Sequence, residues 1–137
     1  MQRNIDLIRE LLLRLEALSE DTFSIIVVMA DNPVFNSHLG TKISIDGYNF
    51  NQISYHLSLI AEAGFLCLTE EQPVVGLSFT RLSWQGHDYI DSIRGQEIWD
   101  KTKEGIKDTG SFTIDLVKQL AIGFVKKKIE DNTGVVI

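Results

Sequence analysis

Residues suited to acid–base chemistry gather in one short stretch that contains Trp84, His87, Asp88 and Asp91. His87 and Asp91 stand four residues apart, so in a helix an imidazole and a carboxylate would share one face. A structural role explains the same residues better. Asp88 would stabilise the positive end of a helix, and Trp84 and Ile90 would seal a hairpin against that helix. We therefore expect no catalytic residues and no enzymatic activity.

Histidine and cysteine, the usual zinc ligands, are too scattered along the chain to form a metal site. His38, His56 and His87 are isolated from one another, and Cys67 is the single cysteine. A structural zinc site uses four such ligands at close spacing. Gly40-Thr41-Lys42 also lacks the order and the upstream glycine of a phosphate-binding loop. The sequence predicts no metal and no cofactor.

Helical periodicity of apolar residues predicts the elements that carry these side chains. The steps of three and four residues from Asn4 to Leu18 indicate an amphipathic helix. A second helix, Asn49 to Ala63, would begin with a capping box between Asn49 and Gln52 and end at Gly64. Beyond it we expect a helix from Trp84 to about Arg94 capped by Ser83, a segment from Gln96 to Lys107, and a last helix capped by Ser111 and ending near Ile129.

Runs rich in β-branched residues predict strands at Thr22 to Met29, Lys42 to Ile45, Phe65 to Thr69 and Leu77 to Leu82. The last two would form a hairpin, and the order helix, strand, helix, hairpin is that of a winged helix. We therefore predict an α+β fold with a winged-helix core (helix, strand, helix, β-hairpin wing) over residues 1–94. A C-terminal helical extension over residues 95–137 would pack on this core or on a second subunit.

The charge balance argues against a nucleic-acid partner. The chain has 13 basic and 19 acidic side chains, a net charge of −6, and residues 1–94 account for all of it with six basic and twelve acidic groups. A domain that binds duplex DNA normally presents a basic face, because contacts with phosphates supply most of its non-specific affinity. The sequence therefore favours a polypeptide partner.

The N-terminus and the apolar runs indicate a protein of the cytoplasm. The longest apolar runs, Phe23 to Ala30 and Leu120 to Val125, are far shorter than the roughly 20 residues that cross a bilayer. The first residues alternate charge with leucine, unlike a signal peptide. A single cysteine agrees with a reducing compartment. We expect no membrane contact.

Several stretches resemble a small bacterial and prophage family known as domain of unknown function 2513. They are Arg3 to Leu13, Ile45 to Tyr48, Ile53 to Leu57, Glu62 to Phe65, Leu82 to Asp91 and Ile98 to Lys103. The resemblance implies a cytoplasmic, winged-helix-like protein, often phage-associated, with no assigned activity. It transfers no catalytic residues. The chain departs from the family between Glu20 and Thr41, where its connection is longer and more apolar.

The helix from Asn49 to Ala63 offers the best candidate for partner binding. In a winged helix it would occupy the position of the DNA-recognition helix, yet its outer face contains no lysine or arginine. Tyr55, Ser58, Leu59 and Glu62 form a mixed stripe on that face, which suits a protein partner or a second copy of the chain. A helix that merely packs on its own domain is the alternative.

The last helix is apolar on more than one face, which exceeds what docking on one core requires. We predict a homodimer seam formed by Leu116, Leu120, Phe124 and Val125, with deep burial within one chain as the alternative. The leading interpretation is a non-enzymatic adaptor or regulator that binds protein as a homodimer. The competing one is a DNA-binding transcriptional regulator, with nucleic-acid contacts from Asn51, Gln52 and Lys126, Lys127 and Lys128, joined by Lys101, Lys103 and Lys107 after dimerisation.

Overall fold

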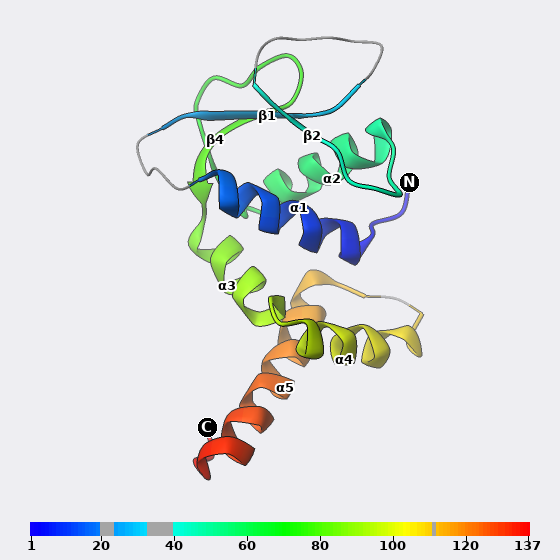
Figure 1. Ribbon diagram of the computed structural model, residues 1–137, viewed down its shortest axis with the longest axis vertical. Coiled ribbons are helices and arrows are strands. Elements are labelled where there is room, and N and C mark those ends of the chain that lie inside the picture. Colours follow the sequence, from blue (N-terminus) through cyan, green and yellow to red (C-terminus); the bar gives the residue numbers. More distant parts are fainter. Residues whose placement is uncertain (20–23, 33–39, 111) are drawn as a thin grey trace. The chain divides into compact units, whose positions relative to one another are not determined.

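The computed structural model describes residues 1–19, 24–32, 40–110 and 112–137 (Figure 1). Within it the chain forms two compact units, residues 1–87 and residues 88–137, which are described separately. The units divide inside the helix Trp84–Ile93, whereas the sequence predicts a boundary after Arg94.

The first unit combines two helices with a four-stranded mixed sheet. Its elements are α1 (Ile5–Leu18), β1 (Ile26–Ala30), β2 (Thr41–Ile43), α2 (Phe50–Glu62), β3 (Leu66–Leu68), β4 (Leu77–Leu82) and the beginning of α3 (Trp84–Ile93). The strand order is β2-β1-β4-β3. β1 is parallel to β2 and antiparallel to β4, and β3 pairs with β4 as the predicted hairpin. The four predicted strands are present, although Thr22 and Phe23 lie outside the described residues.

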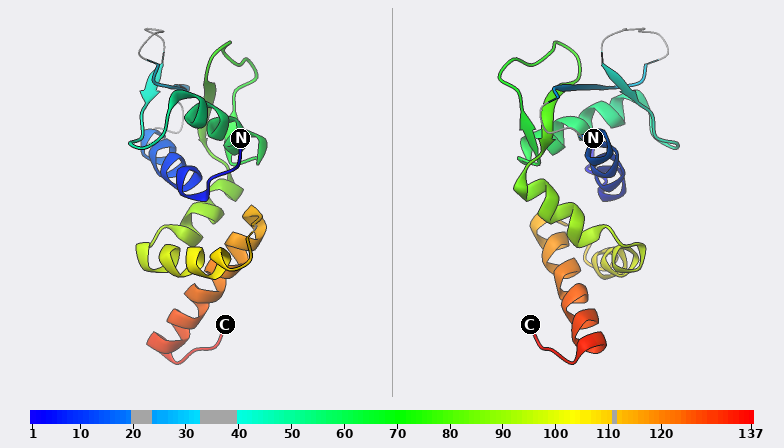
Figure 2. Two further views of the ribbon diagram at one scale, coloured as in Figure 1. Left: turned by 90° about the vertical axis from the view of Figure 1, so that its right-hand side faces the viewer. Right: turned by 60° about the vertical axis from the view of Figure 1, so that its left-hand side comes forward.

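α1 and α2 pack together on one side of this sheet (Figures 1 and 2). Leucines of α1 and the apolar side of α2 meet residues of β1 and β4 in the core. The largest side chains of that core are fully buried: Leu7, Leu11, Leu12, Leu15, Ile60, Phe79 and Leu82. Burial of such side chains supplies the main favourable free energy of the fold.

Local signals set the helix ends in this unit. The capping box predicted for α2 is present, because Asn49 Oδ1 accepts from the Gln52 amide and Gln52 Oε1 accepts from the Asn49 amide, both at 2.9 Å. Gly64 follows α2 in the left-handed region, with φ of 78°, where glycine is favoured. Ser83 caps α3 as predicted, since its Oγ accepts from the Gly86 amide at 3.1 Å.

The second unit is helical. It contains the remainder of α3, α4 (Gln96–Lys107) and α5 (Ile114–Thr133), with α4 packed on α5. The hydroxyl of Thr113 caps α5 by accepting from the Leu116 amide at 3.1 Å. The predicted cap, Ser111, lies outside the described residues. α5 ends at Thr133, four residues beyond the predicted end, and of its residues only Val117 and Ala121 are buried.

The α+β class is therefore confirmed, with five helices and one four-stranded sheet in the described residues. None of the helices in this part of the chain has the length and apolar character needed to cross a bilayer.

Candidate partner-binding surface

The outer face of α2 presents the predicted stripe. Tyr55, Ser58 and Glu62 are exposed and Leu59 is half-buried, while Ile53, Leu57 and Ile60 anchor the opposite side of the helix in the core. The stripe therefore mixes an aromatic ring, a hydroxyl, an aliphatic side chain and a carboxylate along two turns of a firmly held helix.

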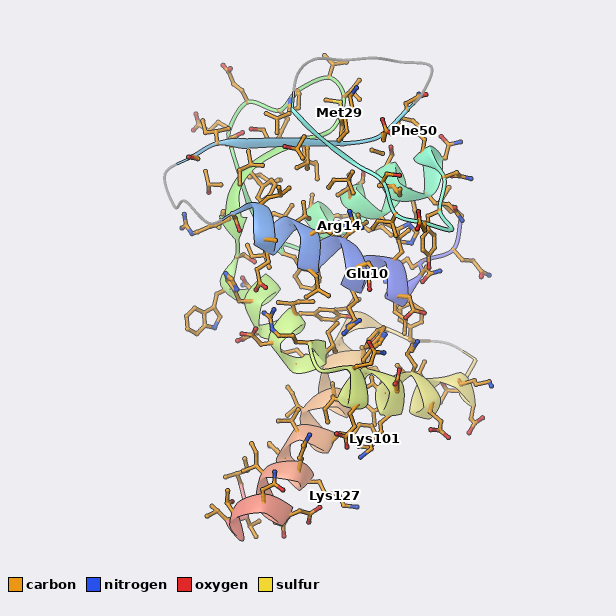
Figure 3. All side chains as sticks on the ribbon, viewed as in Figure 1. Glu10, Arg14, Met29, Phe50, Lys101 and Lys127 are labelled. Atoms are coloured by element: carbon orange, nitrogen blue, oxygen red, sulfur yellow. The ribbon has the colours of Figure 1, made fainter. Side chains whose placement is uncertain are left out.

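A groove lies beside this stripe, between α2 and the loop that joins β3 to β4. We call it the α2–loop groove. It has a volume of about 310 Å³ and shares four residues with a neighbouring hollow of about 180 Å³. Met29 of β1 and Phe50 of α2, both labelled in Figure 3, line both hollows. Other lining residues are Ala30, Ser54, Leu57, Ser58, Val74, Val75, Gly76 and Leu77 in the first, and Asn32 and Lys42 in the second.

The loop that forms one wall of this groove is held by the side chain of Gln72. Its Nε2 donates to the carbonyls of Thr69 and Ser78, both at 2.8 Å, and its Oε1 accepts from the Ser78 amide at 2.9 Å. The side-chain amide of Gln72 thus bonds both backbone groups of Ser78, as the backbone of a paired strand would. Val74, at the loop tip, is fully exposed. The loop is therefore held by polar contacts while it presents an apolar side chain to solvent.

Gly76 brings this loop against the sheet. Its φ is 86°, in the region that favours glycine, and a Cβ at this position would collide with the carbonyl oxygen of Val28 in β1. The close approach places Val75 and Leu77 along the groove. Sequence reasoning found Ser58 but missed the groove, although Gly76 followed by a predicted strand was a signal for a close backbone approach.

His56 has a structural role that the sequence did not reveal. It is almost completely buried. Its Nδ1 donates to the Gln52 carbonyl at 2.7 Å, because a carbonyl oxygen can only accept, and its Nε2 accepts from the Asn4 amide at 2.9 Å. His56 therefore ties the start of α1 to the middle of α2 and has no ring nitrogen left for a metal ion.

The residues suited to acid–base chemistry around α3 do not form a single site in the part of the chain that the structure describes. His87 Nδ1 lies 3.6 Å from a carboxylate oxygen of Glu16, whereas Asp91 binds Arg94 at 2.7 Å. The prediction that Trp84 packs over the hairpin was wrong, because its side chain is 80% exposed. The buried residues of α3 are Gly86, Tyr89, Ile90 and Ile93, and Trp84 in the first turn lies on another side of the helix.

Metal binding finds no support in the described residues, where no group of three or more histidine, cysteine, aspartate or glutamate side chains is placed to hold an ion. The single cysteine, Cys67, is half-buried in β3.

The predicted dimer seam on α5 is only partly exposed. Leu116 is exposed, and Leu120, Phe124 and Val125 are half-buried. Leu120 lies against α4, where a Cβ on Gly105 would stand 2.8 Å from its Cδ2. α4 therefore covers part of the apolar surface of α5 for which the sequence analysis found no partner within the chain.

The predicted nucleic-acid contacts belong to both units. On α5, Lys126 and Lys127 are exposed, and Lys127 is labelled in Figure 3. Lys128 Nζ binds Glu97 Oε2 of α4 at 3.0 Å. Hydrogen bonds from Lys128 and Lys101 hold the pKa of Glu97 below its ordinary value. On α2, the Gln52 side chain is engaged in the capping box. Asn51 is exposed.

These observations define an α+β protein that carries an apolar groove beside a mixed polar and apolar helix face. Comparison with known proteins gives its family. The chain belongs to the family described as hypothetical protein (DUF2513), whose pattern matches residues 2–112. It is 31% identical over 124 residues to an uncharacterised protein of Haemophilus influenzae, a match that covers 88% of this chain and 92% of the relative. No solved structure matches the chain.

Proposed function

We propose that this chain is a non-enzymatic adaptor or regulator of the cytoplasm that binds another protein through the outer face of α2 and acts as a homodimer. The observation that carries this proposal is the stripe formed by Tyr55, Ser58, Leu59 and Glu62 beside the α2–loop groove. Aromatic and aliphatic side chains next to a preformed apolar groove are typical of surfaces that bind polypeptide.

Charge supports a polypeptide partner over a duplex. The first unit has five basic and ten acidic side chains, a net charge of −5, and α2 contains no lysine or arginine. The β3–β4 loop adds Glu70 and Glu71, both exposed. Carboxylates repel a phosphate backbone, so this surface lacks the attraction on which non-specific DNA binding depends.

A winged-helix arrangement is part of the same proposal. α1, α2 and the β3–β4 hairpin follow in the expected order, with β4 paired to an earlier strand. In this interpretation α2 takes the position of the recognition helix, and its surface has been adapted from phosphate to protein contacts.

Site-specific photocrosslinking tests the proposal. A photoreactive aromatic residue at position 55 should capture a discrete polypeptide in cells that produce the full chain. The same residue at position 84 is the matched control, because Trp84 is also an exposed aromatic residue but lies outside the stripe. Equal crosslinking at both positions, or none at position 55, would contradict a partner site on α2.

A mobility shift with random duplex DNA tests the competing function. We expect no shift at low or moderate salt. A shift that weakens steeply with salt, and that is lost when Lys126, Lys127 and Lys128 are replaced by glutamine, would make a DNA-binding regulator the better interpretation, with these lysines as phosphate contacts.

A further inference from the structure

Each of the three segments that line the α2–loop groove carries an exposed carboxylate close by in the sequence. Asp31 directly follows β1. Glu62 stands four residues after Ser58, a groove residue, and therefore lies on the same side of α2. Glu71 stands three residues before Val74 in the β3–β4 loop. Negative charge thus accompanies the groove on β1, on α2 and on the loop.

These carboxylates lack basic partners in the part of the chain that the structure describes. Asp31, Glu62 and Glu71 form no ion pair with any described residue. α2 and the loop over residues 69–76 contain no lysine or arginine. Lys42 lines the neighbouring hollow, but it already has an interaction within the chain. The surface around the groove therefore favours a partner of positive charge.

The groove itself is apolar, and its loop wall is fixed before anything binds. Met29, Phe50 and Val75 contribute to its walls. The bonds of Gln72 and the close approach of Gly76 to β1 hold the loop, so little conformational entropy is lost on binding. A volume of about 310 Å³ is at the small end for a ligand site, which suits the anchoring side chains of a polypeptide segment.

We propose that the α2–loop groove binds a basic polypeptide segment, whose apolar side chain enters the groove while its lysine or arginine side chains meet Asp31, Glu62 and Glu71. The inference rests on the proposed function, because it names the chemistry of the partner that α2 binds. Burial of the apolar anchor supplies affinity. The surrounding carboxylates select a basic segment over an acidic one and speed its association.

Fluorescence anisotropy of the full chain with a labelled synthetic peptide tests the proposal. The peptide carries a pair of leucines between flanking lysines. One matched control peptide has glutamate in place of every lysine, and the other has serine in place of both leucines. We expect saturable binding of the first peptide, weakened by added salt, and no binding of either control peptide.

Substitutions at exposed positions separate the apolar contribution from the charged one. Val74→Ser combined with Val75→Ser should raise the dissociation constant of the peptide about tenfold, because the loop wall loses its apolar surface. Ile25→Ser, at an exposed apolar residue that lines neither hollow, is the control. Glu71→Gln should raise the dissociation constant about two- to fivefold at low salt. Glu10→Gln removes the same charge from α1 and should leave it unchanged.

The proposal is overturned by equal binding of the glutamate peptide, by unchanged binding in the Val74 and Val75 double variant, or by equal effects of Glu71→Gln and Glu10→Gln. A parent dimer that this double variant dissociates in light scattering would assign the groove to a second copy and also overturn it. Tyr55 lines neither hollow, so photocrosslinking from position 55 tests the partner face separately. Capture of a partner there, together with a failed peptide test, would leave the proposed function standing without a basic groove ligand.

Discussion

His56 shows at the scale of one residue how a polar side chain can organise the core. Its two ring nitrogens bond the Gln52 carbonyl and the Asn4 amide. Asn4 and His56 are 52 residues apart in the sequence. His56→Ala leaves the half-buried Asn4 amide without its acceptor, and an unsatisfied donor that is withdrawn from water costs about 1–3 kcal/mol. We expect a loss of that size in the free energy of unfolding, measured by urea denaturation. His87→Ala is the control, because His87 is largely exposed, and an equal loss there would contradict the role of His56.

The burial of Tyr89 makes the free energy of unfolding depend on pH in the alkaline range. Desolvation by burial raises the pKa of its phenol above the ordinary value near 10. The unfolded chain therefore releases the phenolic proton at a pH where the folded chain still holds it. Stability is fully present below pH 10 and falls as the pH rises further.

The measurement is thermal unfolding between neutral pH and pH 11, with Tyr89→Phe as the comparison. The parent chain should lose more stability over this range than the variant, which has no phenol at position 89. The appearance of phenolate absorbance should also show one of the three tyrosines ionising only on unfolding. Identical pH dependence in both proteins would show that Tyr89 ionises freely in the folded state.

At the scale of secondary-structure elements, two helical glycines have opposite expected effects. A Cβ on Gly86 of α3 would collide with the backbone carbonyl oxygen of Phe65, whereas nothing lies within 4 Å of a Cβ on Gly123 of α5. Gly86→Ala should destabilise the chain by about 1–3 kcal/mol through overpacking. Gly123→Ala should stabilise it by up to about 1 kcal/mol, since alanine is the better helix former. Chemical denaturation compares the two variants, and a stabilising Gly86→Ala would refute the close contact between α3 and the backbone of Phe65, directly before β3.

The contact between α4 and α5 lowers the pKa of Glu97. Lys128 and Lys101 favour its charged form, so the ion pairs contribute to stability above the ordinary pKa of glutamate and are lost as the pH falls through the lowered value. Lys128→Met should move the pKa of Glu97 back up, as followed by NMR of the side-chain carboxyl. Lys127→Met, at the neighbouring exposed lysine, should leave it where it is. If the pKa of Glu97 is the same in Lys128→Met as in the parent chain, Lys128 of α5 does not contact Glu97 of α4.

At the scale of the whole molecule, each unit carries one tryptophan in a different environment. Trp84 of the first unit is 80% exposed and Trp99 of the second is almost fully buried. In Trp84→Phe the remaining emission should shift strongly to the red on unfolding, because Trp99 moves from the interior into water. In Trp99→Phe the emission of the remaining Trp84 should shift little on unfolding, because Trp84 is already exposed in the folded chain. Quenching by acrylamide of the folded variants gives the same contrast, and efficient quenching of Trp99 would mean that the helical unit is loosely packed.

Much of the fold could be predicted from short-range patterns. The capping box at Asn49 and Gln52, the left-handed Gly64 and the Ser83 cap are interactions between residues at most three positions apart, and the apolar periodicity of α1 and α2 names the residues that enter the core. The partner stripe on α2 followed from the same periodicity, because residues opposite a buried face must be exposed.

The sequence by itself determined the α+β class, the helix and strand positions and the sign of the surface charge, because each depends on composition or on neighbours along the chain. Only the tertiary structure decided that His56 bonds Asn4, that Trp84 faces solvent and that β1, α2 and the β3–β4 loop enclose a groove. These features join segments that are tens of residues apart, and the side chains that meet across such distances are selected by packing of the whole core, which no local pattern encodes.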